Sequence, residues 1–343
     1  MLYKVIDKSA YKDFIKSLIS DYQLIGPKKK DKATHDFVHI KDFGELDTDY
    51  KKTTIPPAKK VLFPPNEELV KYKLGDNITV EPVIEAEEKI LFGINAWDIN
   101  GMNFLDRIFI TDFVDENYMA KREKLIVIGM DSEPSENNFA LSMNAEYAEK
   151  GFDLYISELA DKFFIRTATV KGNELLDKYT DATEAGEVDF KGYTKYMDEY
   201  RKKFSSDVKM KNFYDSFEFI YDKDEFWEKV AKNCYSCGSC NLVCPTCFCF
   251  NVKDDIALDL KNGMKTREWD SCMIADYGLV AGDHNFRSSK ENRLKQRYRC
   301  KLKTFKEKFD VYSCVGCGRC IDTCLAKINI AEDIDSVKKE VSI

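Results

Sequence analysis

The chain has 343 residues, of which 44% are hydrophobic and 33% charged, so it is long enough for two folded domains with separate cores. Its formal net charge is −7, and residues 1–233 hold 35 Lys and Arg against 45 Asp and Glu, which argues against nucleic-acid binding. No apolar run reaches the ~18 residues that cross a bilayer, and no signal-peptide pattern is present, so we expect a cytoplasmic protein with no membrane insertion.

Residues 1–222 are predicted to form a mixed α/β domain that serves as a scaffold or docks partner proteins. Apolar spacing over 9–22 predicts a helix with Ser9 as its N-cap. The Lys-rich and Pro-rich segments 26–36 and 51–65 are predicted to be loops.

Two short, continuous apolar runs, 89–94 and 124–130, predict buried strands in this domain. Helical spacing between them, with Asp98 as the expected cap, indicates a strand–helix–strand unit and therefore some parallel sheet. Residues 152–170 are predicted to form a hairpin that turns at 160–161.

The second predicted domain spans 223–343 and begins with a helix over 224–233. Two further stretches, 252–263 and 292–309, are predicted to be helical, and the second carries an apolar stripe at helical spacing. The expected fold class is therefore α+β, with an α-helical ferredoxin-like domain after the mixed α/β domain.

All twelve cysteines lie in this second domain, and eight of them form one motif stated twice. The motif is C-x2-C-x2-C-x3-C, the spacing typical of bacterial [4Fe–4S] ferredoxins. Its two copies are Cys234, Cys237, Cys240 and Cys244, followed after 69 residues by Cys314, Cys317, Cys320 and Cys324.

The spacing also predicts which thiols share a cluster. Three closely spaced cysteines wrap one face of a cube, and the fourth cysteine of each motif points away to ligate the other cube. We therefore assign Cys234, Cys237, Cys240 and Cys324 to one cluster, and Cys314, Cys317, Cys320 and Cys244 to the other. Zinc is the alternative, but zinc sites favour two separated C-x2-C pairs.

Four cysteines remain outside the motifs: Cys247, Cys249, Cys272 and Cys300. Four is the ligand number of one further iron–sulfur centre, so a third centre is possible. The alternative is that they are small buried side chains beside the clusters, because free cysteine is often buried as an apolar residue.

Three charged features near the motifs have both an ordinary and a functional interpretation. His284 is either a hydrogen-bonded structural residue or a proton relay. The basic run 287–308 holds ten Lys and Arg and two acids, and is either a solvated helix face or a source of countercharge for the clusters. Arg319, next to Cys320, is expected to raise the potential of its cluster.

The ordered segments 237–250, 269–273, 281–287 and 314–320 resemble the iron–sulfur subunit of anaerobic sulfite reductase and, more broadly, the β subunits of cytoplasmic sulfhydrogenases. The sulfite reductase resemblance implies an electron-transfer subunit without catalytic residues. It would relay electrons from an NADH-oxidising flavin subunit to a siroheme subunit, which reduces sulfite to sulfide in a dissimilatory-type complex. The alternative is the β subunit of a nickel–iron sulfhydrogenase.

Two departures from these relatives affect the interpretation. Asn138 and Ala140 stand where related chains often have cysteine, and Cys300 stands where they often have histidine. A self-sufficient reductase is disfavoured because no G-x-G-x-x-G follows a predicted strand. A DNA-binding sensor is disfavoured by the acidic first part and the missing helix-turn-helix pattern.

Overall fold

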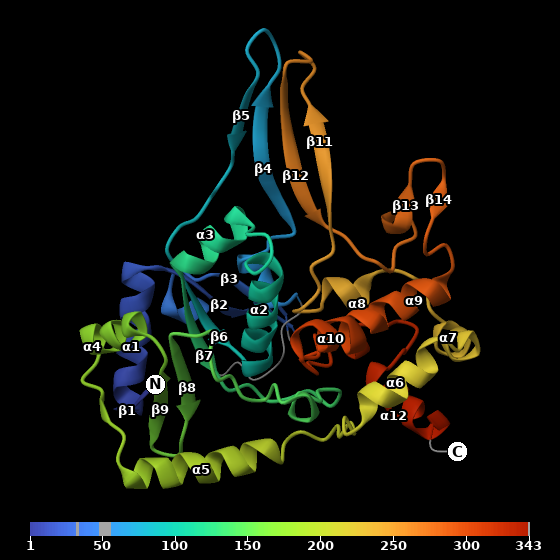
Figure 1. Cartoon of the computed structure of the whole chain (residues 1–343). Helices are drawn as coiled ribbons and strands as arrows, with labels where there is room; N and C mark the ends of the chain where they lie inside the picture. The colour runs from blue at the N-terminus through green and yellow to red at the C-terminus, as the bar shows by residue number, and fades with distance from the viewer. Residues whose placement is uncertain (32–33, 48–55, 342–343) are drawn as a thin grey trace.

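The protein is described by a computed structural model that covers residues 1–31, 34–47 and 56–341. Its centre is a mixed sheet of eight strands in the order β10-β1-β9-β8-β7-β6-β2-β3 (Figure 1). The pairs β2–β6, β6–β7 and β7–β8 are parallel, and the other pairs are antiparallel. The strands are β1 (Leu2–Asp7), β2 (Gln23–Lys29), β3 (His35–His39), β6 (Lys89–Ile94), β7 (Leu125–Met130), β8 (Leu154–Glu158), β9 (Lys162–Thr167) and β10 (Thr183–Glu184).

Each face of this sheet buries its own apolar core. One core joins the sheet to α1 (Lys8–Asp21) and α4 (Val170–Tyr179). The other joins it to α2 (Ala96–Phe109) and α3 (Glu116–Lys124), and it also includes Phe305 from the C-terminal part. Helices α2 and α3 therefore cover the second face of the sheet, and Phe305 links this core to the part of the chain that carries the cysteine motifs. Helix α5 (Glu187–Arg201) follows β10 and runs along the lower edge in Figure 1.

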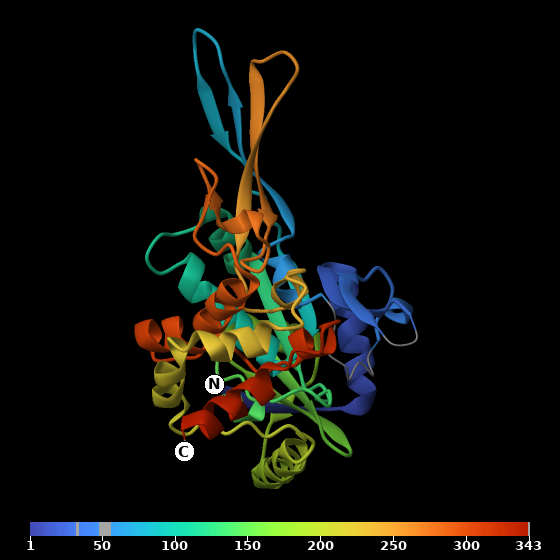
Figure 2. The same ribbon diagram turned by 90° about the vertical axis from the view of Figure 1, so that its right-hand side faces the viewer.

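A four-stranded antiparallel arm projects from the body, as both views show (Figures 1 and 2). Its order is β11-β12-β4-β5, so strands from both ends of the sequence form one sheet. The strands are β4 (Asn66–Lys73), β5 (Thr79–Pro82), β11 (Phe250–Ile256) and β12 (Asn262–Trp269). At its base, buried Arg267 on β12 pairs with Glu67 on β4 and with Asp115 before α3, which fixes the arm to the body.

The C-terminal part packs short helices around the cysteine motifs. These are α6 (Phe213–Tyr221), α7 (Asp224–Ala231), α8 (Ser239–Leu242), α9 (Lys290–Arg299), α10 (Phe305–Phe309), α11 (Arg319–Asp322) and α12 (Ile330–Val341). A π-helical turn, Cys300–Thr304, joins α9 to α10, and a small hairpin, β13 (Leu279–Val280) with β14 (His284–Asn285), precedes α9. α6 and α12 pack side by side, and α8 packs on α11.

Several predicted elements are confirmed. β6 and β7 are parallel buried strands with α2 between them, and β8 and β9 form the predicted hairpin. The helices over 224–233 and 292–309 are also present, with the π-helical turn inside the second. Among the described residues, no helix combines the length and the apolar character that would carry it across a bilayer.

Other local predictions are wrong. Residues 252–263 lie in the β11–β12 hairpin and not in a helix, because β11 pairs with β12, and β12 pairs in turn with β4 from the first part of the chain. Asp259 accepts hydrogen bonds from the backbone N–H groups of Lys261 and Asn262, and this turn was the missed local signal.

The predicted caps and one predicted loop also differ from the structure. Helix α1 begins after Asp7 and not at Ser9, and α2 is capped by Asn95, whose side chain accepts from the N–H of Asp98. The predicted loop 26–36 contains the end of β2 and the start of β3. Within the predicted loop 51–65, residues 51–55 lie outside the described part, and Ala58–Val61 forms a 3-10 turn.

Candidate iron–sulfur site

The two cysteine motifs fold into the same backbone shape. In each motif the second and fourth residues after the first cysteine have left-handed backbone angles: φ is 54° at Ser236 and 80° at Gly238, and 65° at Gly316 and 77° at Gly318. A four-residue helix, α8 or α11, then carries the third cysteine. Because glycine adopts positive φ without a steric penalty, Gly238, Gly316 and Gly318 suit these turns.

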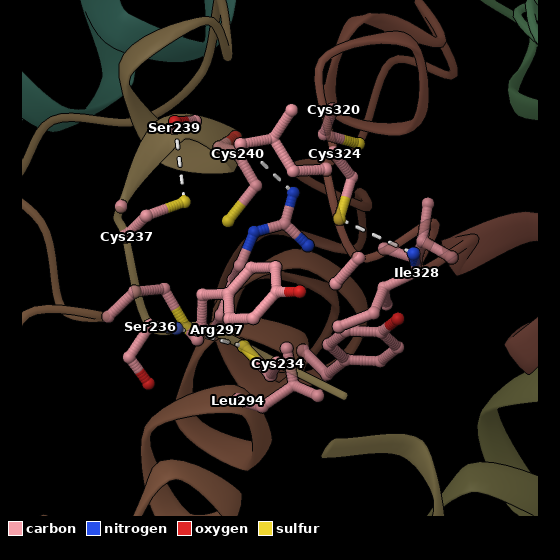
Figure 3. A pocket seen from close by; sticks show the side chains of 17 residues that line it. Cys234, Ser236, Cys237, Ser239, Cys240, Leu294, Arg297, Cys320, Cys324 and Ile328 are labelled. Carbon is pink, nitrogen blue, oxygen red and sulfur yellow. Dashed lines mark hydrogen bonds between the residues drawn. The ribbon is translucent and has the colours of Figure 1, made fainter. Parts of the chain in front are cut away.

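The first cavity is lined by three cysteines of the first motif and by two cysteines of the second. Its lining cysteines are Cys234, Cys237, Cys240, Cys320 and Cys324. In Figure 3 the sulfur atoms of Cys234, Cys237, Cys240 and Cys324 surround one space next to the Arg297 guanidinium. The sulfur of Cys320 points away from that space (Figure 3).

The second cavity is lined by the remaining motif thiols. Its lining cysteines are Cys244, Cys314, Cys317 and Cys320, together with Pro245, Arg297 and Lys301. The structure thus brings together both predicted sets, including the fourth cysteine from the opposite motif in each. Because Cys320 and Arg297 line both cavities, the two cavities are immediate neighbours.

Backbone N–H groups already donate to two of these sulfur atoms. The N–H groups of Ser236 and Ile328 donate to Cys234 Sγ at 3.4 Å and Cys324 Sγ at 3.3 Å (Figure 3). Such N–H···S bonds stabilise negative charge on thiolates and tune the clusters that they ligate.

Four of the eight motif thiols have a raised pKa, because burial disfavours the charged thiolate. Burial raises the pKa of Cys240 to about 11 and that of Cys314 to about 12. Two motif thiols differ: a hydrogen bond with the Ser239 hydroxyl lowers the pKa of Cys237, and a hydrogen bond with the Cys247 thiol lowers the pKa of Cys244. A metal centre deprotonates its coordinating thiols, so buried sulfur of this kind suits metal ligation.

Two buried cations face the same cavities. Arg297 on α9 is 4% exposed, and Lys301 in the π-helical turn is 3% exposed. Arg297 Nε donates to the Asn241 side chain at 3.1 Å, and Lys301 Nζ donates to Thr246 Oγ1 at 2.8 Å. Neither cation pairs with a carboxylate of the described chain.

Burying a charge costs free energy unless an opposite charge compensates it. Arg297 and Lys301 therefore need negative charge nearby. An iron–sulfur cluster with four thiolate ligands carries net negative charge and would supply it. The residues present therefore fit iron–sulfur clusters, through both the thiol sets and the countercharge.

The N-terminal part is built into the site through α2. The buried carboxylate of Asp98 accepts two hydrogen bonds from Arg319, at 2.5 and 2.6 Å, and both side chains are at most 1% exposed. Gly101 faces Pro245 of the first motif so closely that a Cβ there would lie 3.0 Å from Pro245 Cβ. Arg319 therefore adds little net charge to the site, because Asp98 offsets it.

A loop of the N-terminal part also covers the second motif. The N–H of Phe139 donates to the Gly316 carbonyl at 2.8 Å, and Asn137 Nδ2 donates to Asp322 Oδ1 at 2.6 Å. Asn138 is fully buried, and its side-chain oxygen accepts from the N–H of Ala140. This loop therefore serves as a wall of the site.

Other candidate residues lie outside the two cavities. His284 is exposed on β14 and contacts Phe286 through its ring. Of the four further cysteines, Cys249 contacts Cys272, and Cys247 contacts Cys244. The sequence analysis did not identify Asp98 and Asn241 as site residues, because an acid in a helix and an asparagine between motif cysteines form no distinctive pattern.

The described side chains form no binding site for a single metal ion. Across residues 1–31, 34–47 and 56–341, no three His, Cys, Asp or Glu side chains converge closely enough to hold one ion. A [4Fe–4S] cluster differs, since each thiolate binds a separate iron and the four sulfur atoms stand around a cube. The two sets of thiols around the cavities are compatible with this arrangement.

Comparison with known proteins gives the family. Residues 233–328 match the family described as "4Fe-4S dicluster domain". Over 344 aligned positions the chain is 30% identical to sulfhydrogenase 2 subunit beta of Pyrococcus furiosus, with 99% of each chain covered. The chain belongs to the sulfhydrogenase β-subunit family. This member therefore carries a C-terminal iron–sulfur domain behind a mixed α/β part.

The same comparison decides between the two resemblances seen in the sequence. The full-length relative is a sulfhydrogenase subunit, so the finding favours the alternative interpretation over the sulfite reductase interpretation. What both interpretations share, an iron–sulfur electron-transfer subunit of a larger oxidoreductase, is supported by the family and by the dicluster match.

Proposed function

We propose that this chain is the electron-transfer subunit of a cytoplasmic, sulfhydrogenase-type oxidoreductase complex and holds two [4Fe–4S] clusters. One cluster is ligated by Cys234, Cys237, Cys240 and Cys324, and the other by Cys314, Cys317, Cys320 and Cys244. The single observation that supports this proposal is the pair of adjoining cavities, each lined by the first three cysteines of one motif and the fourth cysteine of the other, with Cys320 shared between the two cavities.

We assign different roles to the two parts of the chain on either side of residue 222. Residues 223–343 are the helical ferredoxin-like dicluster domain, although β11 and β12 leave it to join the arm. Residues 1–222 scaffold this domain and dock partner subunits. The buried Asp98–Arg319 pair and the loop that covers Gly316 support this role, since both fix the second motif on the N-terminal part.

The clusters supply reversible one-electron chemistry, and the chain sets its conditions. Burial of Cys244 and Cys317 keeps water from the second cavity, which strengthens every electrostatic interaction inside it. Arg297 and Lys301 favour the extra electron of the reduced state by their positive charge. The proposed role of the chain is therefore electron relay.

The ligand assignment is tested by anaerobic purification, iron analysis and EPR after reduction with dithionite. The two clusters require at least about eight iron atoms per chain, and they should give an EPR signal from interacting centres. Cys324→Ala is expected to damage the cluster of the first motif although it lies in the second. A chain that folds and binds no iron, or damage confined to the nearer motif, would contradict the proposal.

The partner follows from the family and is tested by copurification from the native host. A sulfhydrogenase complex predicts a nickel-containing subunit together with a flavin subunit that oxidises NADH. A second candidate is the anaerobic sulfite reductase complex, which the ordered motifs of 237–250 and 314–320 resemble. It predicts siroheme absorption in place of nickel, so metal analysis and a visible spectrum of the purified complex separate the two.

A further inference from the structure

The four cysteines outside the motifs come from three separate segments beside the dicluster site. Cys247 and Cys249 lie between α8 and β11, Cys272 follows β12, and Cys300 opens the π-helical turn. Cys247 and Cys272 are buried, while Cys249 and Cys300 are half-buried. The thiols of Cys249, Cys272 and Cys300 interact with one another, and the Cys247 thiol contacts Cys244, which lines the second cavity.

Two side-chain amides donate hydrogen bonds to this set of sulfur atoms. Asn241 Nδ2 donates to Cys272 Sγ at 3.1 Å, and Gln296 Nε2 donates to Cys300 Sγ at 3.2 Å. Amide N–H groups aimed at sulfur stabilise thiolates rather than neutral thiols, and they surround metal-bound cysteines for that reason. Thiols that merely filled space in an apolar core would need no such donors.

A third buried cation lies at the same place. Lys59, from the 3-10 turn Ala58–Val61, is 3% exposed, and its ammonium donates to the Cys247 carbonyl at 2.6 Å. It also lies 4.3 Å from the ring centroid of Trp269. No carboxylate of the described residues pairs with Lys59. Like Arg297 and Lys301, this buried ammonium therefore needs negative charge nearby to compensate it.

We propose that Cys247, Cys249, Cys272 and Cys300 ligate a third iron–sulfur cluster next to the two clusters of the proposed relay. Ligation displaces the four thiol protons, and the resulting negative charge compensates Lys59. The π-helical turn has a place in this arrangement, since such turns occur frequently at functional sites. The turn starts at Cys300, and its next residue, Lys301, lines the second cavity.

Asn241 connects this site to the first cavity. Its amide nitrogen donates to Cys272, and its oxygen accepts from Arg297, which lines both other cavities. The third cluster would therefore extend the relay at the side where β11 and β12 leave for the arm. The inference rests on the proposed function for its context, but its ligands are separate residues.

The experiment compares the anaerobically prepared full chain with the double variant Cys249→Ser/Cys272→Ser. We expect iron and acid-labile sulfide near twelve per chain in the parent, for three [4Fe–4S] clusters, and a loss of about one third in the variant. The EPR signals of the dicluster should persist in the variant. Matched variants Cys234→Ser and Cys317→Ser should instead reduce the dicluster signals.

Gln296→Ala provides a second readout that does not depend on losing a ligand. It is expected to change the midpoint potential of one iron–sulfur centre and to leave the other two unchanged. Eight iron atoms in both the parent and the double variant would overturn the third cluster and leave the relay intact. Zinc bound at these thiols would also overturn it, whereas a folded chain without any iron would overturn the relay itself.

Discussion

Arg297→Gln is expected to lower the midpoint potentials of both proposed [4Fe–4S] clusters. Arg297 lines both cavities, is 4% exposed and lacks a carboxylate partner among the described residues. Reduction adds an electron to a cluster, and a neighbouring cation stabilises that electron. Removing the cation therefore makes reduction harder at both sites.

The size of the effect follows from Coulomb's law. A charge separation of about 6 Å and an effective dielectric constant of about 20 give about 3 kcal/mol. For a one-electron couple this corresponds to a shift on the order of 100 mV toward lower potential. Arg297→Lys keeps the charge and loses only the planar guanidinium, so its shift should be a small fraction of that.

The assay is a redox titration of the anaerobic protein followed by EPR, after iron content has shown that the clusters are intact. Asp98→Asn/Arg319→Gln is the matched control, because it removes a buried pair whose net charge is zero. We expect little shift from this control. Unchanged potentials in Arg297→Gln, or a shift as large in the control pair, would refute the electrostatic reasoning.

Three further predictions test ligation, packing and titration. Cys244→Ala should remove a ligand from the second cavity and change the EPR signal of the opposite motif; an unaltered second cluster would contradict crossed ligation. Gly316→Ala would place a Cβ 2.6 Å from the backbone of the covering loop at φ 65°, and should destabilise the fold by more than ~3 kcal/mol in chemical unfolding. Gly282→Ala, at φ 81° with open space, is its control and should cost only ~1–2 kcal/mol; equal losses would remove the clash argument. Burial raises the pKa of Asp333 to about 6 from 3.8, so its contribution favours folding at low pH and is lost as the pH rises through about 6. Asp333→Asn should therefore stabilise the protein by up to ~3 kcal/mol at pH 8 and by about half of that at pH 5, and a gain independent of pH would contradict this assignment.

The sequence alone predicts what depends on local spacing. The eight motif cysteines and the strand–helix–strand unit around α2 follow from periodicity and motif spacing, which short stretches of chain encode. The basic run 287–308 suggested countercharge, yet ten cations were candidates. Only packing selects Arg297 and Lys301, because the direction of a side chain depends on which helix face is buried.

What the sequence does not predict are contacts between distant segments. Residues 252–263 have helical spacing, but β11 pairs with β12, and β12 pairs with β4, almost two hundred residues earlier, so sheet pairing overrides the local pattern. In the sequence, Arg319 is recognisable only as a cation beside a cysteine. Its partner Asp98 lies in another part of the chain, and the carboxylate offsets the expected effect of Arg319 on the cluster potential.

These long-range contacts bear on the redox site as a whole. Gly101 admits Pro245, Asp98 holds Arg319, and Lys59 reaches the Cys247 carbonyl, so three residues from the N-terminal part meet the cysteine segments. Removing one partner of a buried charge pair costs about 3–5 kcal/mol. The dicluster part is therefore not an independent module set beside a scaffold. Its cysteine segments and Arg319 contact residues of the N-terminal part directly, so substitutions at Gly101, Asp98 or Lys59 are expected to disturb the redox site.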